Sequence, residues 1–403
     1  MRAVTHLCAL GHTAPAATLA RVSATLLPID AGRRPLDDHR EVAGQEALER
    51  LRSAAKPLSG ASILCLTAAD AAGSQAPNYL RSLLPLMADV GVEVRWRALA
   101  SGSHGKVGEW LEQALGGAEF AASGSEWDEW VEESASAVEP ELANADAVVF
   151  HDAAALGGVA AARSGAPRCA WSRHEGAPTP DPVASERLEE LLAGVQVEDI
   201  AAATDPLGPR NHELPRKLSG QVLRSLGVDL TRPYVCQTGT IDRWTDPHTA
   251  IDAFDLLKDT LPELQLVIAG ALPGQGAGDM RIAKEIDDYA EGRADVHVKT
   301  GYAGVGNVEL NALQRVARAG LSLRLREGLT VDQFETWWNG TPVVDDADAG
   351  TIAARVEELV RDPGLAVELG ATGRARVRRR HLITHALEDE LRLAASLLGT
   401  VAR

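Results

Sequence analysis

Short apolar runs alternate with helix-like segments through the second half of the chain, and this alternation constrains the fold more than any other feature. The apolar runs occupy residues 234–239, 264–270, 296–301 and 320–325, and helical periodicity follows each of them. Strands separated by helices pair in parallel through right-handed crossovers, which predicts an α/β fold with helices on both faces of a sheet. The first half begins the same pattern, with strands expected at 62–67, 92–99, 145–152 and 168–175 and a helix from residue 78.

A stretch rich in proline and turn-forming residues, 208–232, separates the two sets of strands. We therefore expect two doubly wound Rossmann-like domains that face each other across a cleft. The predicted domains are residues 1–215 and 216–384, with residues 385–403 crossing back onto the first domain. Ligands of such sheets bind beyond the carboxyl ends of the strands, so the loops after the strands are the candidate walls of the site.

Composition excludes several classes of partner. The net charge of −17 over 403 residues argues against nucleic acid or an anionic membrane surface. No apolar run approaches the ~18 residues of a membrane-spanning helix, and the N-terminus does not read as a secretory signal. The four cysteines are scattered without metal-ligand spacing, so we expect thiols in a reducing cytoplasm and neither a metal site nor a cofactor.

The most informative motif for function is LRLREGLTVDQFETWWNG at residues 323–340. It sets Glu327 in a predicted loop and Glu335 at the head of a predicted helix, and a Thr-Pro-Val-Val segment follows. Carboxylates at a helix start also occur for a simpler reason, because the helix dipole favours negative charge there. The spacing nevertheless resembles the glutamate-x7-glutamate signature of retaining glycosyltransferases with the GT-B fold.

Further segments resemble, in the right order, the trehalose synthases of that class, which transfer glucose from a nucleotide sugar to glucose. The segments lie at 34–60, at 151–155 (HDAAA), at 169–174 (CAWSRH), at 204–214 (TDPLGPRNHEL), at 304–317 (GVGNVELNALQRVA) and at 381–393 (HLITHALEDELRL). The resemblance implies retaining, metal-independent transfer of a sugar from a nucleotide-diphospho-sugar to a small-molecule acceptor, with the leaving phosphate as base. We also expect a homodimer.

The same resemblance assigns roles to individual residues. His151 would face the reacting sugar, Glu327 the donor sugar and Glu335 the ribose of the nucleotide; His151 and Glu327 are thus the predicted catalytic residues. A histidine at a strand end can also simply cap a loop, so both interpretations of His151 stay open. The other predicted donor-side residues are Gly239, Thr240, Arg243, Thr245 and Arg324, and the predicted acceptor-side residues are Gly73, Asn78, Asp152 and His174.

The chain departs from the family where the donor diphosphate is expected. The family carries Ser-Arg-Phe-Asp-Pro-Trp-Lys after the first strand of the second domain, and its Arg and Lys neutralise the leaving group. Here Thr240 and Thr245 stand at the two cationic positions, and Asp332 adds a negative charge about where phosphate is expected. Arg243 and Arg324 are the residues expected to compensate, since an arginine fork can hold a diphosphate.

These departures leave more than one function open. The preferred hypothesis is an active glycosyltransferase with altered donor recognition, recruited to a specialised-metabolite pathway. The second is a catalytically degenerate GT-B protein that binds a sugar, a nucleotide or a partner enzyme. The third is a pseudo-glycosyltransferase, which couples two molecules in the same cleft without forming a glycosidic bond.

Overall fold

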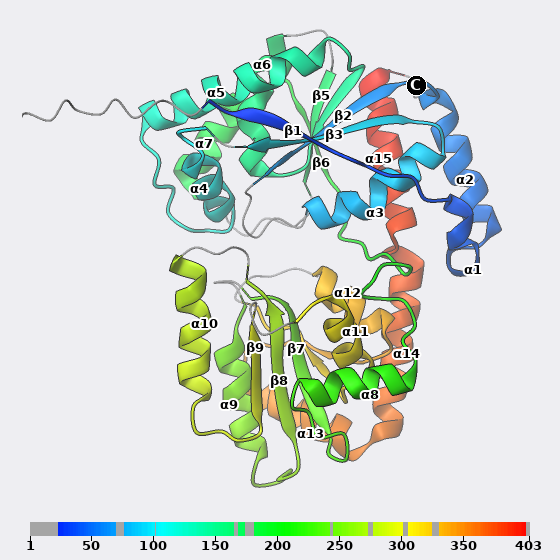
Figure 1. The fold of residues 1–403 in the computed structure, drawn as a ribbon, viewed down its shortest axis with the longest axis vertical. Coiled ribbons are helices and arrows are strands. Elements are labelled where there is room, and N and C mark those ends of the chain that lie inside the picture. Colours follow the sequence, from blue (N-terminus) through cyan, green and yellow to red (C-terminus); the bar gives the residue numbers. More distant parts are fainter. Residues whose placement is uncertain are drawn as a thin grey trace, which may run out of the picture.

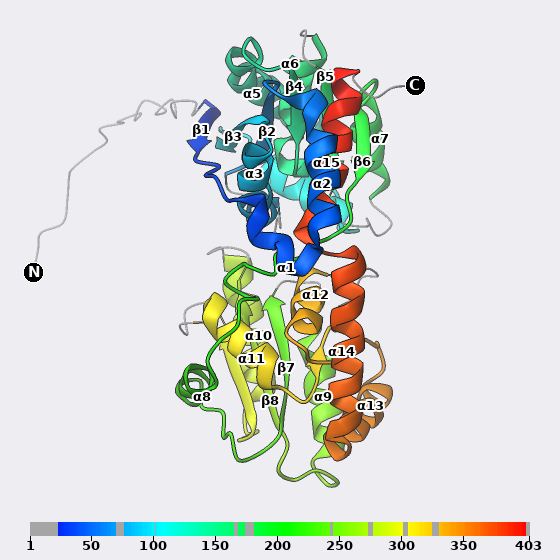
Figure 2. The same cartoon turned by 90° about the vertical axis from the view of Figure 1, so that its right-hand side faces the viewer.

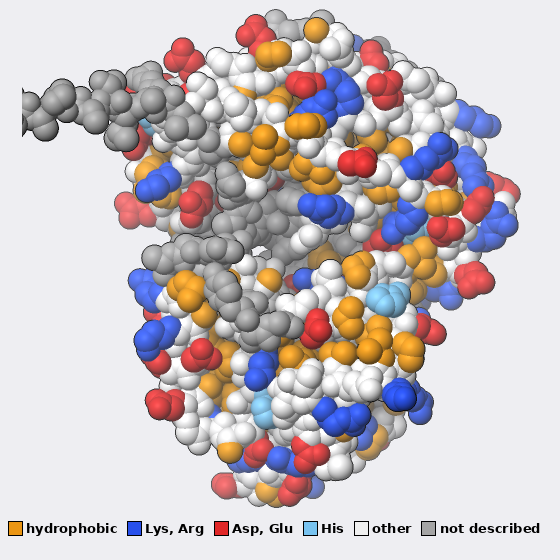
Figure 3. Space-filling model, in the orientation of Figure 1, with side chains coloured by type: hydrophobic (Ala, Val, Ile, Leu, Met, Phe, Trp, Pro, Cys, Tyr) orange, Lys and Arg blue, Asp and Glu red, His pale blue; other side chains and the backbone are white. Residues whose placement is uncertain are grey.

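The computed structural model describes residues 23–69, 76–100, 102–164, 168–173, 181–241, 245–272, 277–300, 305–324 and 330–399. In these residues the chain forms two α/β halves, each built on its own sheet, placed one above the other along the longest axis (Figure 1). The predicted α/β class and the predicted pair of doubly wound sheets are confirmed. The surface is hollowed between the two halves (Figure 3).

The sheet of the first half has the strand order β1-β3-β2-β4-β5-β6. Its members are β1 (Thr25–Ile29), β2 (Ser62–Ala68), β3 (Glu93–Ala100), β4 (Ala147–Phe150), β5 (Arg168–Arg173) and β6 (Gln196–Asp199). Every neighbouring pair is parallel except β1 with β3, which run antiparallel. The edge strands β1 and β6 are additions to the predicted set.

Helices cover both faces of this sheet. One face carries α2 (Gln45–Ala55), α3 (Ala76–Asp89) and α15 (Ile383–Leu398), and the other carries α4 (Lys106–Leu115), α5 (Gly124–Leu142), η3 (Ala153–Gly158), α6 (Val159–Ser164) and α7 (Pro182–Leu191). Short turns of helix, η1 (Leu36–His39), α1 (Arg40–Ala43) and η2 (Lys56–Leu58), flank α2. Successive residues of β2 point to opposite faces, so Cys65 joins one core and Leu66 the other.

The sheet of the second half is parallel throughout, with the order β11-β10-β7-β8-β9. Its members are β7 (Tyr234–Thr240), β8 (Gln265–Ala271), β9 (Val296–Thr300), β10 (Gly320–Leu321) and β11 (Val343–Val344). On one face pack α9 (Pro247–Leu257), α10 (Ala277–Ala290) and α13 (Ala349–Arg361), and on the other α8 (Arg216–Ser225) and α11 (Asn307–Val316). Two further helices, α12 (Val331–Trp338) and α14 (Pro363–Arg380), pack against each other beside the junction of the halves.

Two predicted elements differ in their limits. The expected strand at 320–325 is regular only over Gly320–Leu321. The expected helix at 334–339 begins earlier, at Val331, because the Thr330 side chain accepts a hydrogen bond from the Gln333 amide and caps the first turn. The functional consequence is that Asp332 lies within the first turn of α12.

Two segments cross between the halves, and they pair with each other. The Thr204 amide donates to the His381 carbonyl at 2.8 Å, and the Ile383 amide donates to the Thr204 carbonyl at 2.9 Å. Beyond this point α15 packs against α2, α3 and β5 of the first half, so the C-terminal helix does return to that sheet (Figure 2). The domain limits at residues 215 and 384 stay predictions. No helix in the described ranges is long and apolar enough to cross a membrane.

Candidate donor and acceptor sites

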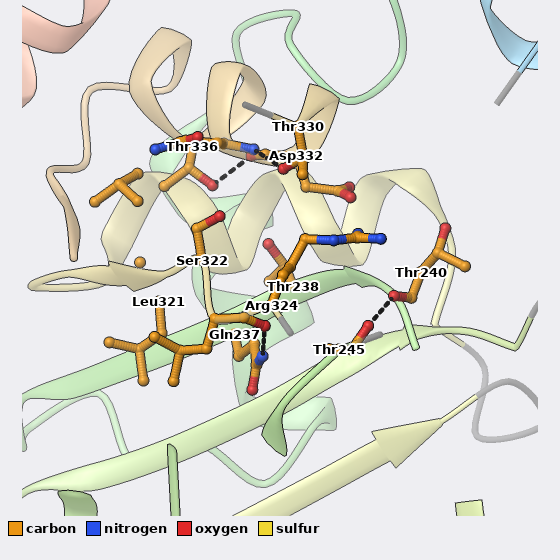
Figure 4. A pocket seen from close by; sticks show the side chains of 14 residues that line it. Gln237, Thr238, Thr240, Thr245, Leu321, Ser322, Arg324, Thr330, Asp332 and Thr336 are labelled. Atoms are coloured by element: carbon orange, nitrogen blue, oxygen red, sulfur yellow. Dashed lines mark hydrogen bonds between the residues drawn. The ribbon is translucent and has the colours of Figure 1, made fainter. Parts of the chain in front are cut away.

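A first pocket lies where β7 and β10 end, against the first turn of α12 (Figure 4). It encloses about 20 Å³, which is room for about one water molecule. Thr240, Thr245 and Arg324, which were predicted from the sequence to contact the donor, meet here. The polar lining comprises Gln237, Thr238, Thr240, Thr245, Ser322, Arg324, Thr330, Asp332, Gln333 and Thr336.

Thr240 and Thr245, which replace the expected cations, are bonded to each other. The Thr245 hydroxyl donates to the Thr240 carbonyl at 2.8 Å. Thr245 also forms an isolated antiparallel bridge with Arg324, whose side chain extends into the pocket on the side of the first turn of α12 (Figure 4). The structure thus brings one of the two predicted compensating arginines into the pocket, and the role of that arginine stays a prediction.

Arg210 is a cation of this region that the sequence did not indicate. It lies in the segment that crosses between the halves, and its Nη1 donates to Oδ1 of Asp332 at 3.0 Å and to Oε2 of Glu335 at 3.1 Å. Its Nε donates to Oδ1 of Asn307 at 3.0 Å. Burial opposes the charge of Arg210, but the two carboxylates outweigh it and hold its pKa above the ordinary value. Arg210, Asp332 and Glu335 form what we call the α12 charge cluster.

Asp332 lies directly against the end of β7. Gly239 has a φ of 137°, and a methyl group added there would lie 2.5 Å from Cγ of Asp332. Only a residue without a side chain allows this approach, both because of the contact and because L-residues rarely adopt that φ. A carboxylate of the chain itself therefore occupies the space beside Gly239, at the N-terminal end of α12.

Glu335 lies one turn further along α12 and faces a second pocket. It is buried, which raises its pKa above the ordinary value to about 7, although Arg210 acts in the opposite direction. The second pocket, of about 300 Å³, lies between the halves. Its lining brings Glu335, predicted for the donor, together with Asn78, predicted for the acceptor, and includes Arg34, Arg81, Arg210 and Asn307.

His151 follows β4 in the first half and is buried. Its Nδ1 lies 3.8 Å from Oε1 of Glu390, a residue of α15 that the sequence did not indicate. Ser172 donates to the same Oε1 at 2.7 Å and Tyr79 donates to it at 3.3 Å. Burial raises the pKa of Glu390 to about 7. The predicted histidine thus belongs to a buried polar cluster closed by the C-terminal helix.

Asp152 orders the loop that follows β4. Its two carboxylate oxygens each accept from the Ala68 amide at 3.0 Å, and Oδ1 also accepts from the Ala155 amide at 3.2 Å. Burial, reinforced by the charge of Glu112, raises its pKa well above the ordinary value. Its carboxylate therefore holds backbone groups of two segments, and its predicted contact with an acceptor stays untested.

Four predicted residues lie outside the described residues: Gly73, His174, Arg243 and Glu327. Within the described ranges no three His, Cys, Asp or Glu side chains converge in a way that could hold a metal ion. The expectation of metal-independent chemistry stays an expectation.

Comparison with known proteins bears on the identity of this chain. The family model described as "Trehalose synthase, N-terminal domain" matches residues 69–202. The trehalose synthase of Rubrobacter xylanophilus is 28% identical over 92% of this chain and 99% of its own length, and that of Pyrococcus horikoshii is 25% identical over 91% and 98%.

Solved structures agree on the fold. A UDP-forming α,α-trehalose-phosphate synthase from Burkholderia xenovorans superposes with a TM-score of 0.63 at 14% identity, covering 85% of this chain and 99% of that chain. An E. coli trehalose-6-phosphate protein bound with UDP-2-fluoro glucose gives 0.64 at 13% identity, covering 85% and 100%. By its sequence over nine-tenths of its length and by its GT-B fold, this chain is a glycosyltransferase of the trehalose synthase type.

Proposed function

We propose that this chain is a retaining, metal-independent glycosyltransferase that moves a sugar from a nucleotide-diphospho-sugar to a small-molecule acceptor in a specialised-metabolite pathway. The α12 charge cluster carries the proposal. It offers carboxylate acceptors for ribose hydroxyls and a cation for phosphate at the carboxyl ends of the second sheet, the edge at which open α/β sheets bind ligands. Trehalose synthases among its relatives support the reaction class.

The donor is proposed to bind the second half. Glu335 accepts hydrogen bonds from ribose hydroxyls, Glu327 contacts the donor sugar, and Arg210 serves as the main cation for the diphosphate. Arg210 already binds one anionic group beside the end of β7, the carboxylate of Asp332 at 3.0 Å, and the diphosphate is proposed to bind next to that carboxylate. Arg243 and Arg324 are proposed as secondary cations. A charge-assisted contact to the leaving phosphate lowers the barrier by stabilising the charge that develops there.

The acceptor is proposed to bind the first half, near His151, His174, Asn78, Gly73 and Asp152. The pocket between the halves supports this arrangement, since Asn78 of the first half and Glu335 of the second half both line it. Transfer proceeds on one face of the sugar, with the leaving phosphate taking the acceptor proton, and the imidazole of His151 faces the reacting sugar. We further propose a cytoplasmic homodimer that needs neither a cofactor nor a metal.

A second candidate function rests on the size of the donor pocket. Its volume of about 20 Å³ and the carboxylate beside Gly239 favour a degenerate protein that binds a sugar, nucleotide or partner enzyme without turnover. A pseudo-glycosyltransferase that couples two molecules without a glycosidic bond uses the same cleft. The two alternatives differ from the main proposal in donor affinity and in products.

Calorimetric titration with UDP, GDP and ADP tests the proposal. One of them should bind, and Arg210→Ala should weaken that binding roughly 10- to 100-fold, the cost of one charge-assisted hydrogen bond. Arg224→Ala, an exposed arginine of α8 in the same half, is the matched control and should change nothing. The nucleotide that binds then names the donors for activity assays, in which the product must keep the anomeric configuration of the donor. Absence of binding to all three nucleotides contradicts the proposal and favours the degenerate protein.

A further inference from the structure

Glu390 is a buried acid in a helix whose inward face is apolar apart from this residue and Thr384. Its neighbours on that face of α15 include Leu387, Leu391 and Ala394, and Glu390 itself is 3% exposed. Burying a carboxylate among such residues costs several kcal/mol unless hydrogen bonds or a charge compensate it. The position therefore calls for an explanation beyond packing, since a leucine would fill the same face at no such cost.

One carboxylate oxygen of Glu390 lies close to side chains from three segments of the first half. Oε1 accepts from the Ser172 hydroxyl at 2.7 Å and from the Tyr79 hydroxyl at 3.3 Å, and it lies 3.8 Å from Nδ1 of His151. These residues belong to β5, to α3 and to the end of β4. His151 is the histidine within ion-pair distance of Glu390 among the described residues, and the two form an ion pair when the imidazole is protonated.

Each of the three segments carries a residue proposed for the acceptor side. Tyr79 directly follows Asn78 on α3, and β5 leads from Ser172 towards His174. The third partner is His151 itself. Glu390 thus contacts His151 itself and bonds to residues that lie one and two positions along the chain from Asn78 and His174, although it belongs to a helix that enters this half from the other one.

We propose that Glu390 is a positioning residue of the transfer reaction, which orients the imidazole of His151 through Nδ1 and fixes the acceptor side of the cleft. This inference rests on the proposed function, in which His151 faces the reacting sugar. The separation of 3.8 Å is longer than a hydrogen bond, so the carboxylate acts on the imidazole through its charge, which favours a proton on Nδ1 over one on Nε2. Acceptor binding and turnover consequently depend on the seating of the C-terminal helix.

The charge of Glu390 changes near neutral pH. Burial raises its pKa to about 7, while the bonds from Ser172 and Tyr79 lower it and the charges of Asp389 and Glu198 raise it; His151 and the Cys65 thiol also face this group. Below pH 7 the neutral acid no longer attracts the imidazole as an anion. Activity therefore rises with pH through this range, as the carboxylate forms and holds His151.

Glu390→Gln tests the inference, because the amide keeps the shape and an accepting oxygen but loses the charge. Its matched control is Glu388→Gln, an acid of the same helix that pairs with Arg392. We expect Glu390→Gln to lower kcat/KM for the acceptor about tenfold, because it removes the charge opposite Nδ1 of His151, and to remove the rise near pH 7. Nucleoside diphosphate affinity should stay unchanged, and Glu388→Gln should match the wild type. An unchanged acceptor kcat/KM and pH profile in Glu390→Gln overturns the inference.

Ser172→Ala supplies a second variant that keeps the charge. Losing this donor should raise the pKa of Glu390 further, so the activity rise should move to higher pH instead of vanishing. A purely structural defect would lower activity without moving the profile. A profile that stays in place in Ser172→Ala counts against the positioning role.

Nitrogen-15 NMR of the imidazoles separates this inference from the proposed function. The His151 signals, assigned by their loss in His151→Gln, should titrate differently and change tautomer ratio in Glu390→Gln, but not in Glu388→Gln. If the wild type transfers no sugar, the proposed function fails, and an altered His151 titration still establishes the contact. An unaltered His151 titration overturns the positioning role whether or not the protein is active.

Discussion

Replacing Asp332 with asparagine should strengthen the binding of a nucleoside diphosphate. Asp332 lies in the first turn of α12, with one oxygen 3.0 Å from Nη1 of Arg210 and its carboxylate against Gly239. The proposed diphosphate binds next to this carboxylate, which therefore repels it and competes with it for Arg210. Asparagine is nearly isosteric and removes the charge without opening a cavity.

The size of the effect follows from the charges in the cluster. Two unit charges about 4 Å apart at an effective dielectric constant of about 20 interact by about 4 kcal/mol, and this is the repulsion between Asp332 and a phosphate. The side chain of Asp332 is 14% exposed, so little water screens it. Arg210 offsets part of the repulsion because its charge lies close to that of Asp332. We expect a net gain of about 1–3 kcal/mol, which is roughly a 5- to 150-fold lower dissociation constant.

Calorimetry of Asp332→Asn and the wild type with the same nucleotide measures the gain, and the corresponding nucleoside serves as an internal control. The nucleoside should bind the two proteins equally, since it carries no phosphate. Asp259→Asn, which changes an exposed aspartate just after α9, should leave both affinities unchanged. An affinity gain that is equal for nucleoside and nucleotide would refute the reasoning, because such a gain does not depend on phosphate charge. A loss of affinity for the nucleotide would also refute it, because the carboxylate would then not repel the phosphate.

Three further predictions concern stability. The contribution of Glu390 to the free energy of unfolding should fall from pH 5 to pH 8, because its native state holds a proton more tightly than the unfolded chain and loses that advantage as the pH passes from 4.5 to about 7. This contribution is roughly 3 kcal/mol, so in urea unfolding Glu390→Gln should be more stable towards high pH, relative to its own stability at pH 5, than the wild type. Gly239→Ala should lower the free energy of unfolding by about 1–3 kcal/mol, because of its φ of 137° and the contact with α12. The loss should exceed that of Gly292→Ala, since Gly292 has a φ of 83° but open space around it. Equal losses of stability in thermal unfolding would contradict the contact. Gly373→Ala should lower the free energy of unfolding by a similar ~1–3 kcal/mol, because the added methyl group would lie 2.6 Å from Cγ of Trp337. An unchanged melting temperature would show that the tryptophan side chain moves aside freely.

The sheets could be predicted from the sequence because buried parallel strands read as continuous apolar runs. The run LQLVIAG, for example, became β8, whose residues are buried through Gly270. The two missed strands are edge strands without such a run. β6 reads QVED and is mostly exposed, and β1 lies in a segment with exposed residues at three of its five positions. These two strands pair only as parts of the assembled sheet, so no local sequence pattern predicts them.

The site was only partly predictable for a related reason. Glu335 and Asp332 were found because a recognisable motif holds both. Arg210 was missed because its partner Glu335 is 125 residues away and its own segment is irregular. Glu390 was missed because a helix with an apolar stripe gives no sign that an acid on that stripe will meet Ser172, 218 residues earlier. Contacts of this kind follow from the tertiary fold and leave no periodic trace.

The two missed residues share a position in the fold that explains why they matter together. Each belongs to one of the two segments that cross between the halves and pair at Thr204 and Leu382. Arg210 follows Thr204 and reaches the start of α12 in the second half, while Glu390 follows Leu382 and reaches His151 in the first. Each crossing segment therefore places one charged residue in the half that it contacts, Arg210 on the proposed donor side and Glu390 on the proposed acceptor side.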